Sequence, residues 1–170
     1  MMLSRLFSSA SLLTPKVEAA LNAQIHAELS ASLTYMAASN YYDSKNLTNI
    51  RDFMRKESNE EKQHAEYIID YINKRNGNAI VPAVGPADIE YNKHDLIFQQ
   101  LMAMEIETEK TLHAAVKAAK EEGDIATEVA MHKMVNDQID AIDEWDAFVE
   151  EIDTFANMQG LIWHFDKKLD

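Results

Sequence analysis

Four stretches of the chain, each close to thirty residues long, repeat apolar side chains at alternating steps of three and four positions. This spacing places the apolar residues of each stretch on one face of an α-helix, as in the core of a helical bundle. The stretches span residues 15–42, 48–75, 93–122 and 124–155. With only 4 glycines and 3 prolines among 170 residues, the sequence argues against a β-fold rich in tight turns. It predicts an all-α protein.

The connections between the stretches indicate their relative directions. Short connectors, residues 43–46 and Gly123, join the first pair and the last pair, which predicts two antiparallel hairpins. The middle connection, residues 78–92, contains Pro82, Gly85 and Pro86 and has no helical period. At ~3.3 Å per residue it is long enough to run the length of a ~28-residue helix. We therefore expect a four-helix bundle with a long crossover between the second and third helices, and a short fifth helix after Gly160.

The N-terminal segment, residues 1–14, differs in character from the rest of the chain. It is rich in serine, contains Arg5, and the first acid of the chain is Glu18. One interpretation is an organelle transit peptide and the other is a flexible arm. The arm fits a cytoplasmic protein, whereas the transit peptide fits a mitochondrial or plastid one. We expect the bundle domain to span residues 15–170, with Thr14 capping its first helix, and no core residue among residues 1–13.

Charge and cysteine content restrict the partners. The chain has 29 acidic and 16 basic residues, a net charge of −13, which argues against nucleic-acid binding and suits metal cations. The absence of cysteine excludes disulfides, thiolate zinc sites and iron–sulfur clusters. No apolar run approaches the ~18 residues of a membrane-spanning helix. Because the chain has no cysteine, any metal must bind carboxylate, imidazole or carbonyl groups.

Each apolar face is interrupted near its middle by polar side chains. The interruptions are Glu28 in the first stretch, Glu57, Glu61 and His64 in the second, Glu105 and Glu109 in the third, and Gln138 in the fourth. In the third stretch the expected face is Phe98, Met102, Glu105, Glu109, Leu112, Val116 and Ala119. An unpaired carboxylate in a low-dielectric core loses several kcal/mol of solvation, and several such groups in one core would also repel one another.

A pair of divalent cations would remove this cost, because it offsets four negative charges. Glu61-x-x-His64 is the i, i+3 motif with which dimetal carboxylate bundles bind metal. We therefore expect a dinuclear metal centre inside the bundle. Glu57 and Glu109 lie one turn from Glu61 and Glu105, and either of them faces solvent if the buried face drifts around its helix.

These residues resemble the ferritins, a family of iron-storing and iron-oxidising shells, over residues 16–169. The resemblance is carried by the segments AQIHAELSASLTYM, SNEEKQHAEYI, AMEIETEK, VNDQIDAI and LIWHFDKKL. It implies a ferroxidase centre with two irons, whose ligands are Glu28, Glu61, His64, Glu105 and Gln138. Glu61 bridges the two irons in this arrangement, and Tyr35 hydrogen-bonds into the site and supplies an electron.

The resemblance also implies the activity and the assembly. Fe(II) is oxidised to Fe(III) by O₂, and the ferric mineral is stored in a shell of twenty-four subunits. Two other classes compete with this hypothesis. A catalytically silent shell subunit would lack the ligands, and a generic helical binding bundle would have no reason to bury acids.

Three positions depart from the patterns of relatives. Lys62 replaces a methionine of the haem-binding members, so we expect no haem. A third iron site would use Glu60, Asp137 and Asp140, but Ala141 replaces a further acid and weakens that site. The iron access channel of animal members uses two acids, and here Glu128 fits the outer position while Met131 occupies the inner one.

Overall fold

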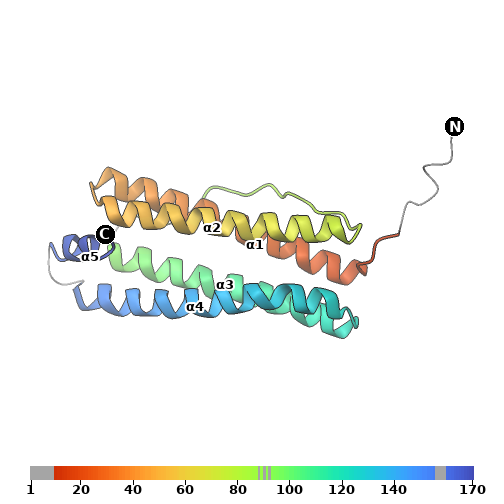
Figure 1. Cartoon of the computed structure of the whole chain (residues 1–170). Coiled ribbons are helices and arrows are strands. Elements are labelled where there is room, and N and C mark those ends of the chain that lie inside the picture. Colours follow the sequence, from red (N-terminus) through yellow and green to blue (C-terminus); the bar gives the residue numbers. More distant parts are fainter. Residues whose placement is uncertain (1–9, 88, 90, 92, 156–159) are drawn as a thin grey trace.

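The computed structural model describes residues 10–87, 89, 91, 93–155 and 160–170, and these residues form five α-helices and no strand (Figure 1). The helices are α1 (Pro15–Ser44), α2 (Thr48–Lys74), α3 (His94–Glu121), α4 (Ile125–Phe155) and α5 (Ile162–Lys168). The four long helices end within two residues of the predicted limits. The predicted all-α architecture with a short C-terminal helix is confirmed.

The helix ends follow from local chemistry. Thr14 caps α1, because its hydroxyl accepts the N–H of Val17 at 3.4 Å, and Pro15 occupies the first turn. Asn46, with φ of 59°, and Asn76, with φ of 55°, adopt the left-handed conformation that ends α1 and α2. Asp124 accepts the N–H of Thr127 at 3.2 Å and so caps α4.

The crossover between α2 and α3 runs back along the bundle, so that α2 and α3 are parallel while α1 and α2, like α3 and α4, are antiparallel (Figure 1). Its first residues are attached to α1 through Asn22. The side chain of Asn22 donates to the carbonyl of Asn78 at 3.0 Å and accepts the N–H of Ile80 at 2.7 Å. The predicted long crossover is therefore observed.

The core consists of two apolar clusters with a polar layer between them. One cluster includes Tyr42, Ile50, Phe98, Trp145 and Phe165, and the other includes Leu13, Leu21, Ile68, Leu112 and Met131. Glu28, Glu61, Glu105 and Gln138 are buried and belong to neither cluster. The predicted pattern, apolar at both ends and polar in the middle, is what the bundle contains.

The end of α2 packs against the residues that precede α1. Leu13 is only 6% exposed, and the N–H of Leu12 donates to the carbonyl of Arg75 at 2.9 Å. A Cβ on Gly77 would lie 2.9 Å from Leu13 Cδ1 and 2.7 Å from Glu18 Oε2, so a larger residue there would have to displace these side chains. The expectation that no core residue precedes Thr14 was wrong, because Leu13 fills this gap. The rest of the proposed arm, residues 1–9, lies outside the described residues.

The fifth helix is attached to the start of α2 by a buried carboxylate. The N-cap residue of α2, Leu47, forms no side-chain hydrogen bond with the free N–H groups of the helix. Instead, Asp166 on α5 accepts the N–H groups of Asn49 at 3.0 Å and Ile50 at 2.9 Å. Two free N–H groups of the α2 N-terminus are thereby satisfied from 117 and 116 residues away in sequence.

Among the described residues, no helix is both long enough and apolar enough to span a lipid bilayer.

Candidate metal centre

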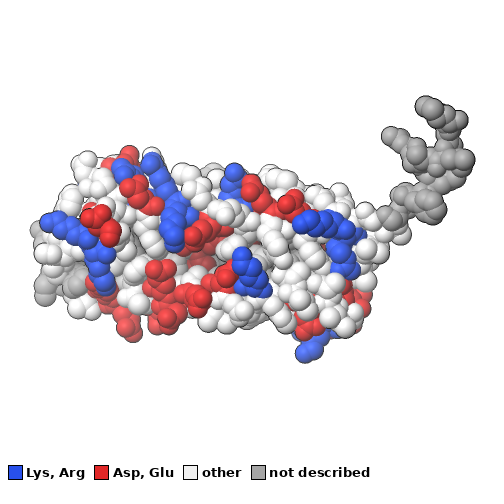
Figure 2. Space-filling view, in the orientation of Figure 1, with Lys and Arg blue, Asp and Glu red and all other residues white. Residues whose placement is uncertain are grey.

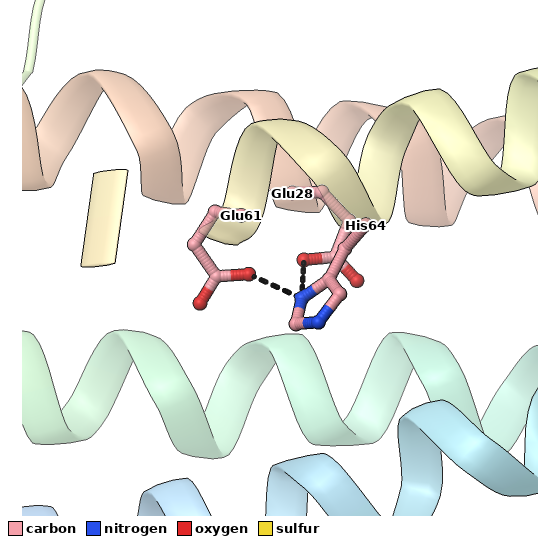
Figure 3. Close-up of side chains that lie close together, drawn as sticks. All are labelled: Glu28, Glu61 and His64. Atoms are coloured by element: carbon pink, nitrogen blue, oxygen red, sulfur yellow. Dashed lines mark hydrogen bonds and ion pairs between the residues drawn. The ribbon is translucent and has the colours of Figure 1, made fainter. Parts of the chain in front are cut away.

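Three predicted ligands converge from α1 and α2 onto the interior of the bundle. Glu28 extends from α1, and Glu61 and His64 extend from α2 toward α3 (Figure 3). The three residues offer ligand atoms that all lie within 4.8 Å of one another. His64 Nδ1 is 3.0 Å from Glu61 Oε2 and 3.9 Å from Glu28 Oε2. The i, i+3 spacing of Glu61 and His64 is what brings both onto one face of α2.

Glu28 is fully buried and holds its two oxygens in different environments. Oε1 accepts a hydrogen bond from Gln24 Nε2 at 2.8 Å. Oε2 is buried and has no hydrogen-bond partner in the protein. A buried oxygen without a partner is costly, and a cation between Glu28, Glu61 and His64 would satisfy it.

Glu105 approaches the same layer from α3. It is fully buried and accepts hydrogen bonds from the hydroxyl of Tyr35 on α1 and from Gln138 Nε2 on α4, the latter at 2.5 Å. Glu105 is not among the three residues whose ligand atoms lie within 4.8 Å of one another. The structure therefore places Tyr35 and Gln138 as partners of Glu105, next to the group formed by Glu28, Glu61 and His64.

Burial and mutual repulsion shift the pKa values of these groups. Burial first, and then the charge of Glu61, raise the pKa of Glu28 well above its ordinary value and that of Glu105 to about 7. Burial would lower the pKa of His64, but its hydrogen bond with Glu61 raises it. Without a cation, the centre therefore retains protons that metal binding would displace.

The donor set favours particular metals. Carboxylate oxygens with one imidazole suit Fe(II) and other first-row divalent cations, and the absence of sulfur ligands disfavours Cu(I). The carboxylates supply the negative charge that two divalent ions need, and Glu28 and Glu105 are fully buried. The arrangement can thus hold metal ions close together among negatively charged side chains.

Comparison with known proteins shows which family shares this architecture. A sequence profile described as a ferritin-like domain matches residues 18–155. The chain belongs to the ferritin family.

Curated relatives include ferritins of plants. The chloroplastic ferritin-3 of Arabidopsis thaliana is 31% identical, over 93% of this chain and 64% of the relative. The chloroplastic ferritin-1 of Brassica napus is 30% identical, over 89% of this chain and 63% of the relative. The chain thus spans about 64% of the length of the first of these relatives.

Solved ferritin structures share the fold. An open-pore ferritin from the archaeon Archaeoglobus fulgidus has a TM-score of 0.88 and 27% identity, covering 92% of this chain and 97% of that one. The apo-ferritin of Pseudo-nitzschia multiseries has a TM-score of 0.87 and 22% identity, covering 91% and 99%. The second likeness concerns the fold alone.

A cavity of about 370 Å³ lies between α2 and α4 and leads from Glu61 and His64 toward the surface. It is lined by Glu61 and His64 and by further acids, namely Glu57, Glu60, Asp137, Asp140 and Glu144. Figure 2 shows acidic side chains gathered over the middle of this face. The cavity connects the centre to a strongly negative surface.

The residues expected to form a third iron site line this cavity, but their ligand atoms do not form a cluster. Glu60 lies 3.4 Å from Lys56 Nζ, and Asp137 lies 4.0 Å from Lys133 Nζ. Within the described residues, only Glu28, Glu61 and His64 bring three ligand atoms within 4.8 Å of one another. In this structure Glu60, Asp137 and Asp140 are a dispersed acidic lining.

The two ambiguous acids have different surroundings. Glu57 is 7% exposed and pairs with Lys56 Nζ at 3.2 Å, so it faces the cavity. Glu109 is half-buried and lies 3.9 Å from His113 Nε2, while Thr108 occupies the buried position beside it. Of the two alternatives left open for Glu109, the structure shows the one in which the buried face of α3 passes through Thr108 and leaves Glu109 at its edge.

The remaining departures concern haem and iron access. Lys62 is exposed and lies 3.5 Å from Glu66. Met131 is fully buried in the second apolar cluster, whereas Glu128 is half-buried. Met131 therefore contributes to the core rather than to a surface route for iron.

Sequence reasoning missed Gln24, which hydrogen-bonds to Glu28, and Thr108 and Thr111, which hydrogen-bond to Gln24. Gln24 is fully buried and contacts Thr108 and Thr111 on α3. The available signal was its position four residues before Glu28, on the same face of the same helix.

Proposed function

We propose that this chain stores iron in an oligomeric shell and oxidises Fe(II) with O₂ at the centre formed by Glu28, Glu61, His64 and Glu105. The observation that supports this most is the convergence of Glu28, Glu61 and His64, with Glu28 Oε2 buried and without a partner. Membership of the ferritin family supports iron as the cargo.

The proposed reaction balances with two irons. Two Fe(II) ions, bound side by side, each lose one electron to one O₂, which takes up two electrons and two protons. In this proposal Glu61 serves both irons, and its position beside His64, together with its effect on the pKa of Glu105, supports that role. Tyr35 and Gln138 hold Glu105 from α1 and α4, so that its carboxylate keeps one orientation as the iron charge changes.

The acidic cavity would carry the ferric product away. Its carboxylates attract cations electrostatically and raise their local concentration. Glu57 and Glu60 lie next to Glu61 in this lining. In the proposed path they are the first residues to receive the ferric ions that leave the centre.

Aerobic iron oxidation tests the proposal. Added Fe(II) should be oxidised rapidly by the parent protein, followed by the absorbance of ferric oxo species. Glu61→Ala should lower the initial rate by more than about ten-fold, because it removes a ligand shared by both irons. It should leave the metal-free protein folded and at least as stable, since one buried charge fewer repels the others.

Glu107→Ala is a matched control, because Glu107 is exposed on α3 and pairs only with Lys110 at the surface. Parent-like oxidation by Glu61→Ala would contradict this location of the centre. Slow oxidation by the parent itself would favour a silent shell subunit, or a generic helical bundle if the protein does not assemble.

The shell is tested by native mass. Twenty-four chains of 19.3 kDa would give about 460 kDa, with iron mineral inside after loading. A monomer or dimer that does not retain iron would argue against the storage role.

The chloroplastic relatives support the organellar alternative for residues 1–14 over a cytoplasmic location. A fusion of residues 1–14 to a fluorescent protein would test it. Import into plastids or mitochondria is expected, and a diffuse cytosolic signal would contradict it.

A further inference from the structure

Gln24 is a fully buried amide whose polar atoms all have partners. Its Nε2 donates to Glu28 Oε1 at 2.8 Å and lies 3.5 Å from the carbonyl oxygen of Thr108. Its Oε1 accepts a hydrogen bond from the hydroxyl of Thr111. The amide thus connects α1 to α3 directly beside the first metal ligand. In a dry core such a fully bonded amide has one preferred orientation.

Charge fixes which end of this amide faces Glu28. When Glu28 is ionised, as a metal ligand must be, reversing Gln24 would set its oxygen against Oε1 of the carboxylate, where two acceptors repel. Thr111 has a second possible acceptor, the carbonyl of Thr108 at 2.9 Å, but a hydroxyl has only one proton to donate. The hydroxyl lies closer to Gln24 Oε1 than to this carbonyl, so we assign its proton to Gln24, which leaves the Gln24 N–H directed toward the carboxylate.

This arrangement decides which Glu28 oxygen is free. Oε1 is occupied by Gln24, whereas Oε2 is buried, has no hydrogen-bond partner, and lies 3.9 Å from His64 Nδ1. Rotation of the Glu28 carboxylate away from His64 would break the Gln24 bond and leave a buried donor unsatisfied.

We infer that Thr111 and Gln24 form a relay of positioning residues that holds Glu28 Oε2 toward the metal and sets the affinity of the first iron position. The inference rests on the proposed function. It concerns metal binding, so it is tested apart from oxidation.

Titration of the full-length, metal-free protein with Co(II), followed by visible absorption, measures the affinity without iron oxidation. Glu28→Gln removes a ligand and identifies the Co(II) bands that belong to this position. Gln24→Met keeps the bulk of the side chain but removes its hydrogen bonds. We expect it to weaken Co(II) binding at that position by roughly 10- to 100-fold, as loss of ligand-orienting partners does elsewhere.

Thr111 provides the sharper comparison, because Thr111 is not next to the ligand. Thr111→Val preserves shape and removes the hydroxyl, and should weaken binding by at least roughly three-fold, while Thr111→Ser should restore it. Thr34→Val is the matched control, since Thr34 is half-buried on α1 and its hydroxyl bonds only to the Ser30 carbonyl of its own helix. Thermal unfolding of each metal-free variant separates affinity from stability.

Parent-like Co(II) affinity in both Gln24→Met and Thr111→Val overturns the relay. Equal losses in Thr111→Val, Thr111→Ser and Thr34→Val also overturn it, because the effect would then be general packing. If the parent binds Co(II) and the variants behave as expected, but Fe(II) is not oxidised, the proposed function fails while the relay stands. A parent that binds no Co(II) with bands sensitive to Glu28→Gln overturns both.

Discussion

At the scale of single residues, the acids of this chain differ mainly in what surrounds them. Glu105 is fully buried and receives two side-chain hydrogen bonds, from Tyr35 and Gln138. Glu109, one turn further along α3, is half-buried beside His113. These two glutamates therefore have different expected roles.

Replacement of these two acids should separate their roles. Glu105→Ala should lower the initial rate of Fe(II) oxidation by more than about ten-fold, since it removes the proposed ligand of the second iron and leaves Tyr35 without an acceptor. Glu109→Ala should leave the rate close to that of the parent. The measurement is stopped-flow absorbance under air. Metal bound to Glu109 and not to Glu105 in crystals soaked with Fe(II) would reverse the assignment.

At the scale of secondary-structure elements, two contacts fix helix ends that the local sequence leaves open. Asp166 on α5 caps α2, and Leu13, just before α1, fills the space beside Gly77 at the end of α2. Each contact joins segments far apart in sequence.

Removal of the Asp166 carboxylate should weaken the start of α2. Asp166→Ala leaves the N–H groups of Asn49 and Ile50 without their acceptor, which should cost about 1–2 kcal/mol of unfolding free energy. Chemical denaturation measures this. Asp153→Ala is the comparison, because Asp153 is exposed and accepts only from Gln99. Equal stability of the two variants would show that the Asp166 carboxylate does not stabilise the start of α2.

The two leucines before α1 should respond differently to truncation. Leu13 is 6% exposed and Leu12 is 61% exposed. Leu13→Ala should cost about 2–3 kcal/mol because it leaves a cavity, whereas Leu12→Ala should change the unfolding free energy by less than about 0.5 kcal/mol. Thermal unfolding under identical conditions compares them. A large effect of Leu12→Ala alone would indicate that its exposed side chain packs against another subunit.

At the scale of the whole molecule, a layer of acids between two apolar clusters makes the metal-free bundle sensitive to pH. Burial raises the pKa of Glu57 and of Glu105 to about 7, although Lys56 opposes the shift at Glu57. The unfolded chain releases these protons near pH 4.5, while the folded protein retains them. The contribution of these two carboxyls to the unfolding free energy should therefore fall as pH rises from about 4.5 to 7 and then level off.

Glu57→Gln should remove part of that fall. Its gain in unfolding free energy over the parent should grow between pH 5 and pH 7.5, because the parent must ionise a buried carboxyl over this range. Denaturation in the presence of a chelator provides the measurement. Glu60→Gln, which also loses an ion pair with Lys56, controls for that pair. A gain that shrinks as pH rises would contradict the assigned direction of the shift.

The sequence by itself determined the four long helices, their directions and the level of the polar layer. Apolar spacing along a helix and connector length are local properties that can be read from the sequence. Buried acids lose solvation free energy unless they share a cation, so the acids of the different helices are expected at one level of the bundle. It did not determine the buried face of α3, because steps of three and four residues fit two adjacent stripes: one contains Glu109 and the other contains Thr108. Packing against α1 selected the stripe with Thr108, which lies beside Gln24.

Only the tertiary structure decided the contacts that cross between distant segments. Thr111 reaches Gln24 across 87 residues, and Asp166 reaches Ile50 across 116. The sequence does not indicate these hydrogen bonds, because a hydroxyl or a carboxylate near a helix end could equally well face solvent and hydrogen-bond to water. Their partners are fixed by how the helices pack, since buried hydrogen-bonding groups accept whichever complementary group the packing brings within reach.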